Sequence, residues 1–227
     1  MKISLMLMFC LTSSLCRAQD ADALVKKIKA KIDLVNNYEA SGKMKTNVAF
    51  LKVPEAQVKV YFKKPNQIRI KNEKGISFVP KGAVSINLSN IISGNQYTAI
   101  DAGYDNIGAV KTKVIKLLPT DDNADVVLST LYIDEAKLVV LKAKTTTREN
   151  GSYQLEMSYG KYANYCLPDK LIFTFNTKDY KLPKGVTFDF DDGATNNKPV
   201  EKNKNGKAEI NFSSYSVNTG VDDSVFK

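Results

Sequence analysis

"VYFKKPNQIRI", residues 60–70, predicts two short β-strands that meet at a Lys-Pro-Asn turn. Proline cannot donate a hydrogen bond to a strand ladder and Pro-Asn favours a turn, so the break falls at Pro65. Together with the preceding valine, one face of the two strands is apolar: Val58, Val60, Phe62, Ile68 and Ile70. The other face is cationic: Lys59, Lys63, Arg69 and Lys71. Such a sheet can bury its apolar face in a packed core or hold a ligand that comes and goes.

The first eighteen residues have the features of a removable secretory signal. Lys2 gives a positive start, and the apolar residues 3–15 are too few to cross a bilayer roughly 30 Å thick. Cys10 and Cys16 also lie here, but each follows a bulky residue, which does not suit a lipid anchor. We therefore expect cleavage near Ala18 and a soluble, exported protein.

Removal of this segment lowers the formal net charge from +9 to +7 and leaves Cys166 as the remaining cysteine. An intramolecular disulfide is then impossible, so residues 19–227 must form their own core, and we expect a single domain. The lysines are spread along the chain, and export argues against a nucleic-acid partner. A basic surface suits anionic headgroups or acidic proteins, or it simply keeps the protein soluble.

The hydrophobic period predicts one helix followed by strands. Residues 20–37 place five apolar side chains at helical spacing, with lysines on the outer face: Leu24, Val25, Ile28, Ile32 and Val35. Residues 38–50 then alternate as a long strand with one apolar face. Its apolar side chains are Tyr38, Ala40, Met44, Val48 and Phe50.

The rest of the chain is mostly β. Residues 85–94 predict a short helix or turn, and alternation resumes over residues 96–118, with interruptions at Gly103 and Gly108. Five further strands are predicted over residues 126–134, 137–147, 152–160, 169–176 and 208–217. The short connections between most of them imply an antiparallel meander. The polar residues 191–207 predict a mobile loop.

Catalytic and metal-binding patterns are missing from the sequence. The chain has no histidine, which removes the commonest general base and the usual triads, and Cys166 therefore has no histidine to activate it. Asp121, Asn123 and Asp125 have the alternate spacing of a calcium loop, but the required glycine and glutamate are replaced by Val126 and Tyr132. We expect no metal, no cofactor and no enzymatic activity.

These elements predict an α+β fold that is mainly β. About nine antiparallel strands in one sheet would curl strongly, and the helices could lie in its concave side without closing a barrel. If the helices do not fill the space, an apolar cavity remains for a hydrophobic ligand. From periodicity alone, a packed core is the simpler interpretation.

The order of these motifs resembles the periplasmic lipoprotein-carrier family (LolA/LolB-like). The resemblance begins with the signal, the amphipathic helix, the tyrosine that opens a long strand, and "VYFKKPNQIRI". It continues through "TLYIDEAKLVVLKAKTTTRENGSYQLEMSYGKY", "LPDKLIFTF" and "INFSSYSVNTGVDDSVF", and so covers most of residues 20–227. It implies a strongly curved, incomplete antiparallel barrel whose helical lid covers a cavity for acyl chains.

On this resemblance, the inward-facing side chains line the cavity: Val48, Phe50, Val58, Val60, Phe62, Ile68, Ile70, Leu131, Ile133, Leu155, Met157 and Phe173. The lid helix covers them through Leu24, Val25, Ile28, Ile32 and Val35. Lys64 stands where the family has an arginine that helps to hold the lid closed, which makes it the candidate latch, although lysine lacks the planar fork of arginine.

The implied function is a periplasmic carrier of Gram-negative bacteria that moves acyl chains toward the outer membrane. The chain lacks tryptophan and has the extra polar residues 191–207. Two kinds of cargo therefore stay as alternatives, an acylated lipoprotein and another amphiphilic lipid. Membrane partner proteins on the inner and outer sides are expected, with a monomeric carrier. The alternatives are a periplasmic sensor or regulator, or a structural envelope protein, with the same fold and no transport role.

Overall fold

The computed structural model describes residues 20–48, 51–52, 55–65, 67–72, 91–92, 96–148, 151–176 and 205–226, with the side chains of Val48, Leu51, Lys52 and Asn176 left aside. Phe50 and residues 177–204 therefore lie outside the described residues, and with them most of the segment predicted to be a polar loop. Among the helical segments that the structure does describe, none has the length and apolarity needed to span a membrane.

The N-terminal helix is described over residues 20–32 and ends earlier than the sequence predicted. Its last turn is closed by a hydrogen bond from the Asp33 amide to the Lys29 carbonyl, 2.8 Å long. Residues 33–36 then leave the helix, and Asn37 opens the first strand. Asparagine favours turns over helix interiors, which suits Asn36 and Asn37 to the connection that follows the helix. Val35, predicted to lie in the helix, is therefore part of the connection.

In the part of the chain that the structure describes, eleven antiparallel strands form one sheet. Their bounds are β1 Asn37–Val48, β2 Leu51–Lys52, β3 Ala56–Lys63, β4 Gln67–Asn72, β5 Tyr97–Ile107, β6 Val110–Pro119, β7 Val126–Asp134, β8 Val139–Thr147, β9 Ser152–Ser158, β10 Lys170–Asn176 and β11 Asn205–Val217. Short 3₁₀ helices follow β9 and β11, at Ala163–Tyr165 and Asp223–Phe226. Residues 205–207, at the end of the segment predicted as a loop, belong to β11.

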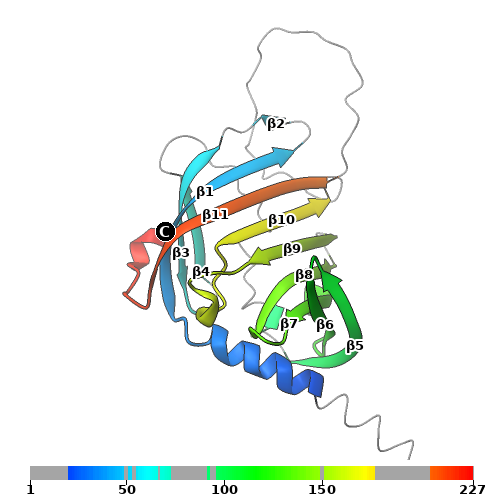
Figure 1. Ribbon diagram of the computed structural model, residues 1–227. Coiled ribbons are helices and arrows are strands. Elements are labelled where there is room, and N and C mark those ends of the chain that lie inside the picture. Colours follow the sequence, from blue (N-terminus) through cyan, green and yellow to red (C-terminus); the bar gives the residue numbers. More distant parts are fainter. Residues whose placement is uncertain are drawn as a thin grey trace, which may run out of the picture.

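The strand order is β4-β3-β1-β11-β10-β9-β8-β7-β6-β5, with β2 paired to β1. Strands β5 to β10 form a meander, and β11 then runs between β10 and β1. The sheet is open, because β4 and β5 lie at its opposite ends. Figure 1 shows it bending, with β5–β8 steeply inclined to β1, β10 and β11, and the helix crossing one end. The prediction of a curved, incomplete antiparallel barrel with a helix is confirmed.

The predicted hairpin is confirmed in its register. Val60 lies opposite Ile70 and Phe62 opposite Ile68, so the apolar side chains of β3 and β4 share one face. We call the face that carries them, and that meets the helix, the inward face. The opposite side is the outward face. The β5–β6 hairpin turns at Gly108, whose φ of 60° is tolerated by glycine.

Among the described residues, two hydrophobic clusters cover the inward face. The first lies under the helix and gathers side chains from β6 to β11. The second gathers side chains from β1, β3 and β11, together with Val35 and Leu167. A row of directly paired residues joins the two clusters across four strands: Met44, Ile210, Leu171 and Met157. The apolar face is therefore continuous through the middle of the sheet.

Candidate functional site

The inward face of the N-terminal hairpin is the first part of the candidate site. Val58, Val60 and Phe62 are 1, 4 and 3 % exposed, whereas Ile68 and Ile70 on the edge strand β4 are half-buried. All five belong to the second cluster or pack against it. Alternation placed these side chains on one face because the strand period is two, and the paired register keeps them together.

The second part of the site lies under the helix. The side chains predicted there are all buried in the first cluster: Leu131, Ile133, Leu155, Met157 and Phe173. Phe173 lies opposite Leu155 on β9 and opposite Ala208 on β11. The structure thus divides the predicted residues between two adjoining clusters. It describes the backbone alone of Val48, so that side chain is not placed.

The helix meets the first cluster through one stripe of side chains. Val25, Ile28 and Ile32 are buried there, and Leu24 packs against the cluster while half-buried. Ala21 is fully buried in the same stripe but was not among the predicted site residues. Its position four residues before Val25 was the available signal, because residues four apart share a helix face.

An aromatic group closes the second cluster. Ring centroids lie 5.3 Å apart for Tyr38 and Phe62, 5.5 Å for Tyr38 and Tyr215, and 5.0 Å for Tyr215 and both Phe212 and Tyr162. Burial raises the pKa of the Tyr38 and Tyr215 phenols, so both stay neutral at physiological pH. The Tyr215 hydroxyl donates to the Pro168 carbonyl at 2.7 Å. Tyr162 comes from the turn after β9, so strand periodicity could not place it in the site.

Two lysines attach the helix to the hairpins. The Lys64 ammonium donates to the Asp33 carbonyl at 2.7 Å, just beyond the helix end. Lys31 donates to the carbonyls of Lys137 and Leu138, in the β7–β8 turn, at 2.8 and 3.2 Å. A cation is favourable at a helix C-terminus, where backbone carbonyls lack partners and the helix dipole is negative.

A third attachment comes from the chain after β11. The Asn218 side-chain oxygen accepts hydrogen bonds from the amides of Asn36 and Asn37 at 2.7 and 3.3 Å. Its side-chain nitrogen donates to the Leu34 carbonyl at 2.8 Å. Asn218 has a φ of 58°, a left-handed conformation that asparagine adopts more readily than most residues. One amide group therefore binds both sides of the connection between helix and β1.

The thiol of Cys166 belongs to the first cluster and is buried. Cys166 is 6 % exposed, and burial raises the pKa of its thiol to about 11. The thiolate, which is the nucleophilic form, is thus disfavoured at neutral pH. Within the described ranges, no group of three or more potential ligand side chains is placed to hold a metal ion.

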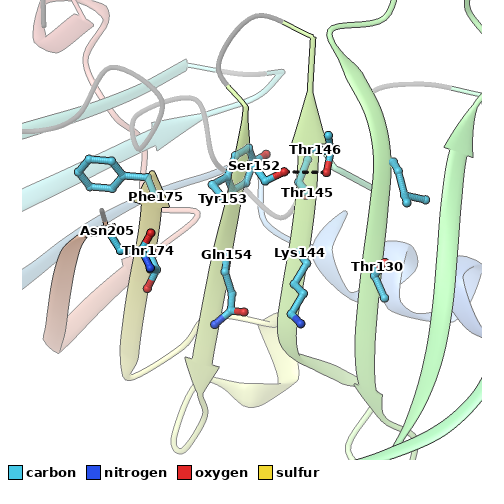
Figure 2. A pocket seen from close by; sticks show the side chains of 11 residues that line it. Thr130, Lys144, Thr145, Thr146, Ser152, Tyr153, Gln154, Thr174, Phe175 and Asn205 are labelled. Carbon is cyan, nitrogen blue, oxygen red and sulfur yellow. Dashed lines mark hydrogen bonds between the residues drawn. The ribbon is translucent and has the colours of Figure 1, made fainter. Parts of the chain in front are cut away.

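A hollow of about 450 Å³ lies at the β7–β11 side of the sheet, and its lining combines polar side chains with Leu128, Tyr153 and Phe175. Figure 2 shows Thr130, Lys144, Gln154 and Thr174 side by side on neighbouring strands. They are directly paired in register, on the outward face. The hollow therefore offers hydroxyl, amide and ammonium groups beside the rings of Tyr153 and Phe175, which pack against the first cluster or belong to it.

Comparison with known proteins shows that this chain is similar in structure to several solved proteins. No family model and no curated protein sequence matches the chain. Among solved structures, an outer membrane lipoprotein-sorting protein domain from Vibrio parahaemolyticus superposes with a TM-score of 0.55 and 12% identity over 92% of this chain and 97% of that one. A DUF1329 family protein from Desulfovibrio piger superposes with a TM-score of 0.57 and 12% identity, over 93% of this chain and 97% of that one. A LolA superfamily protein from Nitrosomonas europaea superposes with a TM-score of 0.54 and 11% identity, over 89% of this chain and 97% of that one.

Proposed function

Starting from a fold shared with the LolA superfamily, we propose that this chain carries acyl chains through the periplasm toward the outer membrane. The acyl chain of a lipoprotein, or of another amphiphilic lipid, lies between the inward face and the N-terminal helix. Delivery and release involve membrane partner proteins on the two sides, and the carrier itself is a monomer. The signal segment, residues 1–18, directs export.

The observation that carries this proposal is the continuous apolar face covered by a narrow helical stripe. In the described part of the chain, the helix contributes four buried side chains: Ala21, Val25, Ile28 and Ile32. Lys31, Lys64 and Asn218 make polar contacts that join its last turn and the connection after it to the rest of the protein. A helix held in this way can swing outward from its N-terminal part while its C-terminal end stays attached.

The magnitudes allow cargo to replace the helix. Burying Val25, Ile28 and Ile32 stabilises the closed state by about 2 kcal/mol each, or roughly 6 kcal/mol together. A bound acyl chain contributes about 0.8 kcal/mol per methylene, so roughly eight methylenes offset the loss of those contacts. A fatty acyl chain of ordinary length exceeds this, and exchange between the helix and the cargo needs no catalytic step.

Lys64 is the latch in this proposal. Its hydrogen bond to the Asp33 carbonyl joins the β3–β4 turn to the end of the helix. This is the role that the family resemblance implies for a basic residue at this position. Lysine supplies a point charge without the bidentate geometry of arginine. The contact therefore restrains one carbonyl and leaves the rest of the helix to be held by apolar packing.

The test is retention of lipid by the protein purified from a Gram-negative periplasm without detergent. Native mass spectrometry is expected to show a co-purifying acyl lipid or lipoprotein. Phe62→Glu and Ile28→Asp place a carboxylate on the inward face and under the helix, and both are expected to lose the lipid because an unpaired charge is costly in an apolar site.

Gln57→Glu is the matched control, because Gln57 is exposed on the outward face of the same strand as Phe62. It adds the same charge and is expected to retain the lipid. Circular dichroism and thermal unfolding establish that each variant is folded. A folded Phe62→Glu protein with its lipid unchanged would contradict the site assignment. A wild-type protein that is empty and ignores added lipids would favour a structural envelope protein.

A further inference from the structure

The outward face of β4, β3, β1 and β11 is strongly cationic. Five exposed cations stand on it: Lys43, Lys45, Arg69, Lys71 and Lys207. We call the outward side of these four strands the basic face. It lies opposite the inward face, because the cations alternate along the strands with the buried apolar side chains.

The charge of the basic face is poorly balanced. Lys59 and Lys63 add two cations, and they are paired with Glu39 and Asp223 at 2.7 and 2.5 Å. Of these two acids, Asp223 lies beyond the strands, so the basic face itself holds seven cations against the carboxylates of Glu39 and Glu209. Its formal net charge is +5. Within the described residues, the five exposed cations form no ion pair.

The positions of the cations add to this imbalance. Lys59 lies directly opposite Lys71, and Arg69 is two residues from Lys71 on the same side of β4. Like charges placed opposite each other destabilise a sheet. The Lys71 ammonium lies 5.8 Å from the centroid of the Tyr61 ring, a cation–π contact that leaves its charge in place. An external anion would relieve this repulsion.

The side chains between the cations indicate the kind of anion. Within the described residues, those that point outward from these four strands are serines, asparagines, glutamines and Tyr61, with no aliphatic side chain. Stable protein interfaces have an apolar or aromatic centre and are depleted in lysine. A broad basic surface without such a centre suits the diffuse negative potential of a membrane that contains anionic lipids.

We propose that the basic face docks the protein on bilayers that contain anionic phospholipids. The interaction goes beyond the carriage of acyl chains, because it uses the side of the sheet opposite the helix. Docking in this orientation keeps the inward face directed away from the lipid surface. It concentrates the protein at the membrane without drawing its apolar site into the bilayer.

The experiment is co-sedimentation of the purified full-length mature protein with sucrose-loaded vesicles at low salt. One set is pure phosphatidylcholine and the other an equimolar mixture of phosphatidylcholine and phosphatidylglycerol. The protein is expected to pellet with the mixed vesicles alone. High salt is expected to release it, since the screening length falls from about 10 Å at 0.1 M to about 3 Å at 1 M.

Lys43→Glu/Lys45→Glu removes two cations from the basic face and adds two carboxylates. Each cation near an anionic surface is worth about a fivefold change in partitioning, so a loss of at least roughly 25-fold is expected. The control, Lys27→Glu/Lys137→Glu, makes the same charge change at exposed positions on the helix and the β7–β8 turn. It is expected to keep most of the binding.

Three outcomes would overturn the proposal. Equal binding to both kinds of vesicle would show that headgroup charge is not recognised, and equal losses in the two double variants would show that net charge alone matters. Binding to soluble polyglutamate but not to mixed vesicles would point to an acidic protein partner. Binding of the protein to vesicles that persists at high salt would report capture of acyl chains by the inward face and not docking by the basic face. The salt dependence therefore distinguishes a failure of docking from a failure of the carrier function.

Discussion

Cys166 shows how strongly one buried group responds to its surroundings. It lies at the end of the 3₁₀ helix Ala163–Tyr165, with a φ of 52°. Its thiol faces the Leu138 carbonyl at 3.6 Å, beside the turn that accepts Lys31. Desolvation raises the pKa of the thiol from 9.0 to about 11, and the nearby Lys31 charge offsets only part of this. The thiol therefore acts as a small apolar side chain.

The stability contributed by Cys166 is expected to fall in alkali. The unfolded chain loses the thiol proton near pH 9, whereas the folded protein keeps it until about pH 11. The contribution is therefore complete below pH 9 and is lost as the pH rises toward 11, at up to about 1.4 kcal/mol per pH unit. Urea unfolding of the wild type and of Cys166→Ala between pH 7 and 11 measures this contribution. The quantity compared between the two proteins is the slope of the free energy of unfolding against pH. Identical slopes would contradict it.

In the proposed carrier, the connection between the helix and β1 is the element on which opening of the site would depend. Its backbone groups are bound from two places far away in the sequence, the β3–β4 turn and the chain after β11. The Lys64 amide donates to the Asn36 carbonyl at 2.9 Å, and the Asn218 amide donates to the Asn37 carbonyl at 2.8 Å. These bonds, with those of the Asn218 side chain, fix the end about which the helix would swing.

Asn218→Gly is expected to loosen this connection. Glycine keeps the left-handed backbone but removes three side-chain hydrogen bonds, each worth about 1 kcal/mol. Hydrogen exchange at the amides of Asn36 and Asn37 is expected to speed up by tenfold or more, while the exchange of β8 and β9 stays unchanged. Acyl-lipid exchange by the variant is expected to be faster, if the connection controls opening.

Lys64→Met provides the comparison for that measurement. It removes the hydrogen bond to the Asp33 carbonyl but keeps the apolar stem and the Lys64 backbone amide. Exchange is then expected to increase in the last helical turn rather than at Asn36 and Asn37. Unchanged exchange in the Asn218→Gly protein would show that the side-chain bonds do not hold the connection.

For the molecule as a whole, β1 is the strand that joins two parts of the sheet. It pairs with β3 on one side and with β11, more than 150 residues later, on the other. A register shift at Ser41 and Gly42 bends this seam. A Cβ at Gly42 would lie 2.6 Å from the Asn211 carbonyl oxygen on β11, which is too close for any side chain. Glycine is therefore needed for the two strands to approach.

Gly42→Ala is expected to weaken the whole fold. The clash is with backbone, so the pairing of β1 and β11 must shift, and a loss of about 1–3 kcal/mol is expected, as for other overpacked core positions. Chemical denaturation measures the free energy of unfolding. Ser41→Ala, one residue away at the same bulge, is the control and is expected to change it by less than about 0.5 kcal/mol. Equal effects of both variants would show that the clash is relieved elsewhere.

Local sequence pattern predicted much of this molecule. The period of two placed Val58, Val60 and Phe62 on one face of the hairpin, and the period of 3.6 placed Val25, Ile28 and Ile32 on one side of the helix. These features could be read because each repeats within a single element. The early end of the helix and the transfer of Val35 to the second cluster could not, because the helix end is fixed by groups from elsewhere in the chain.

The sequence by itself determined the type of each main element, the apolar side of the strands and the basic side opposite it. These depend on the spacing of neighbouring residues, which the order of amino acids contains directly. The tertiary structure alone decided that Asn218 binds the end of the helix, that Tyr162 and Tyr215 close the second cluster, and that Gly42 lies against Asn211. Such contacts join residues from distant parts of the chain, and they exist only when the sheet has brought those strands side by side.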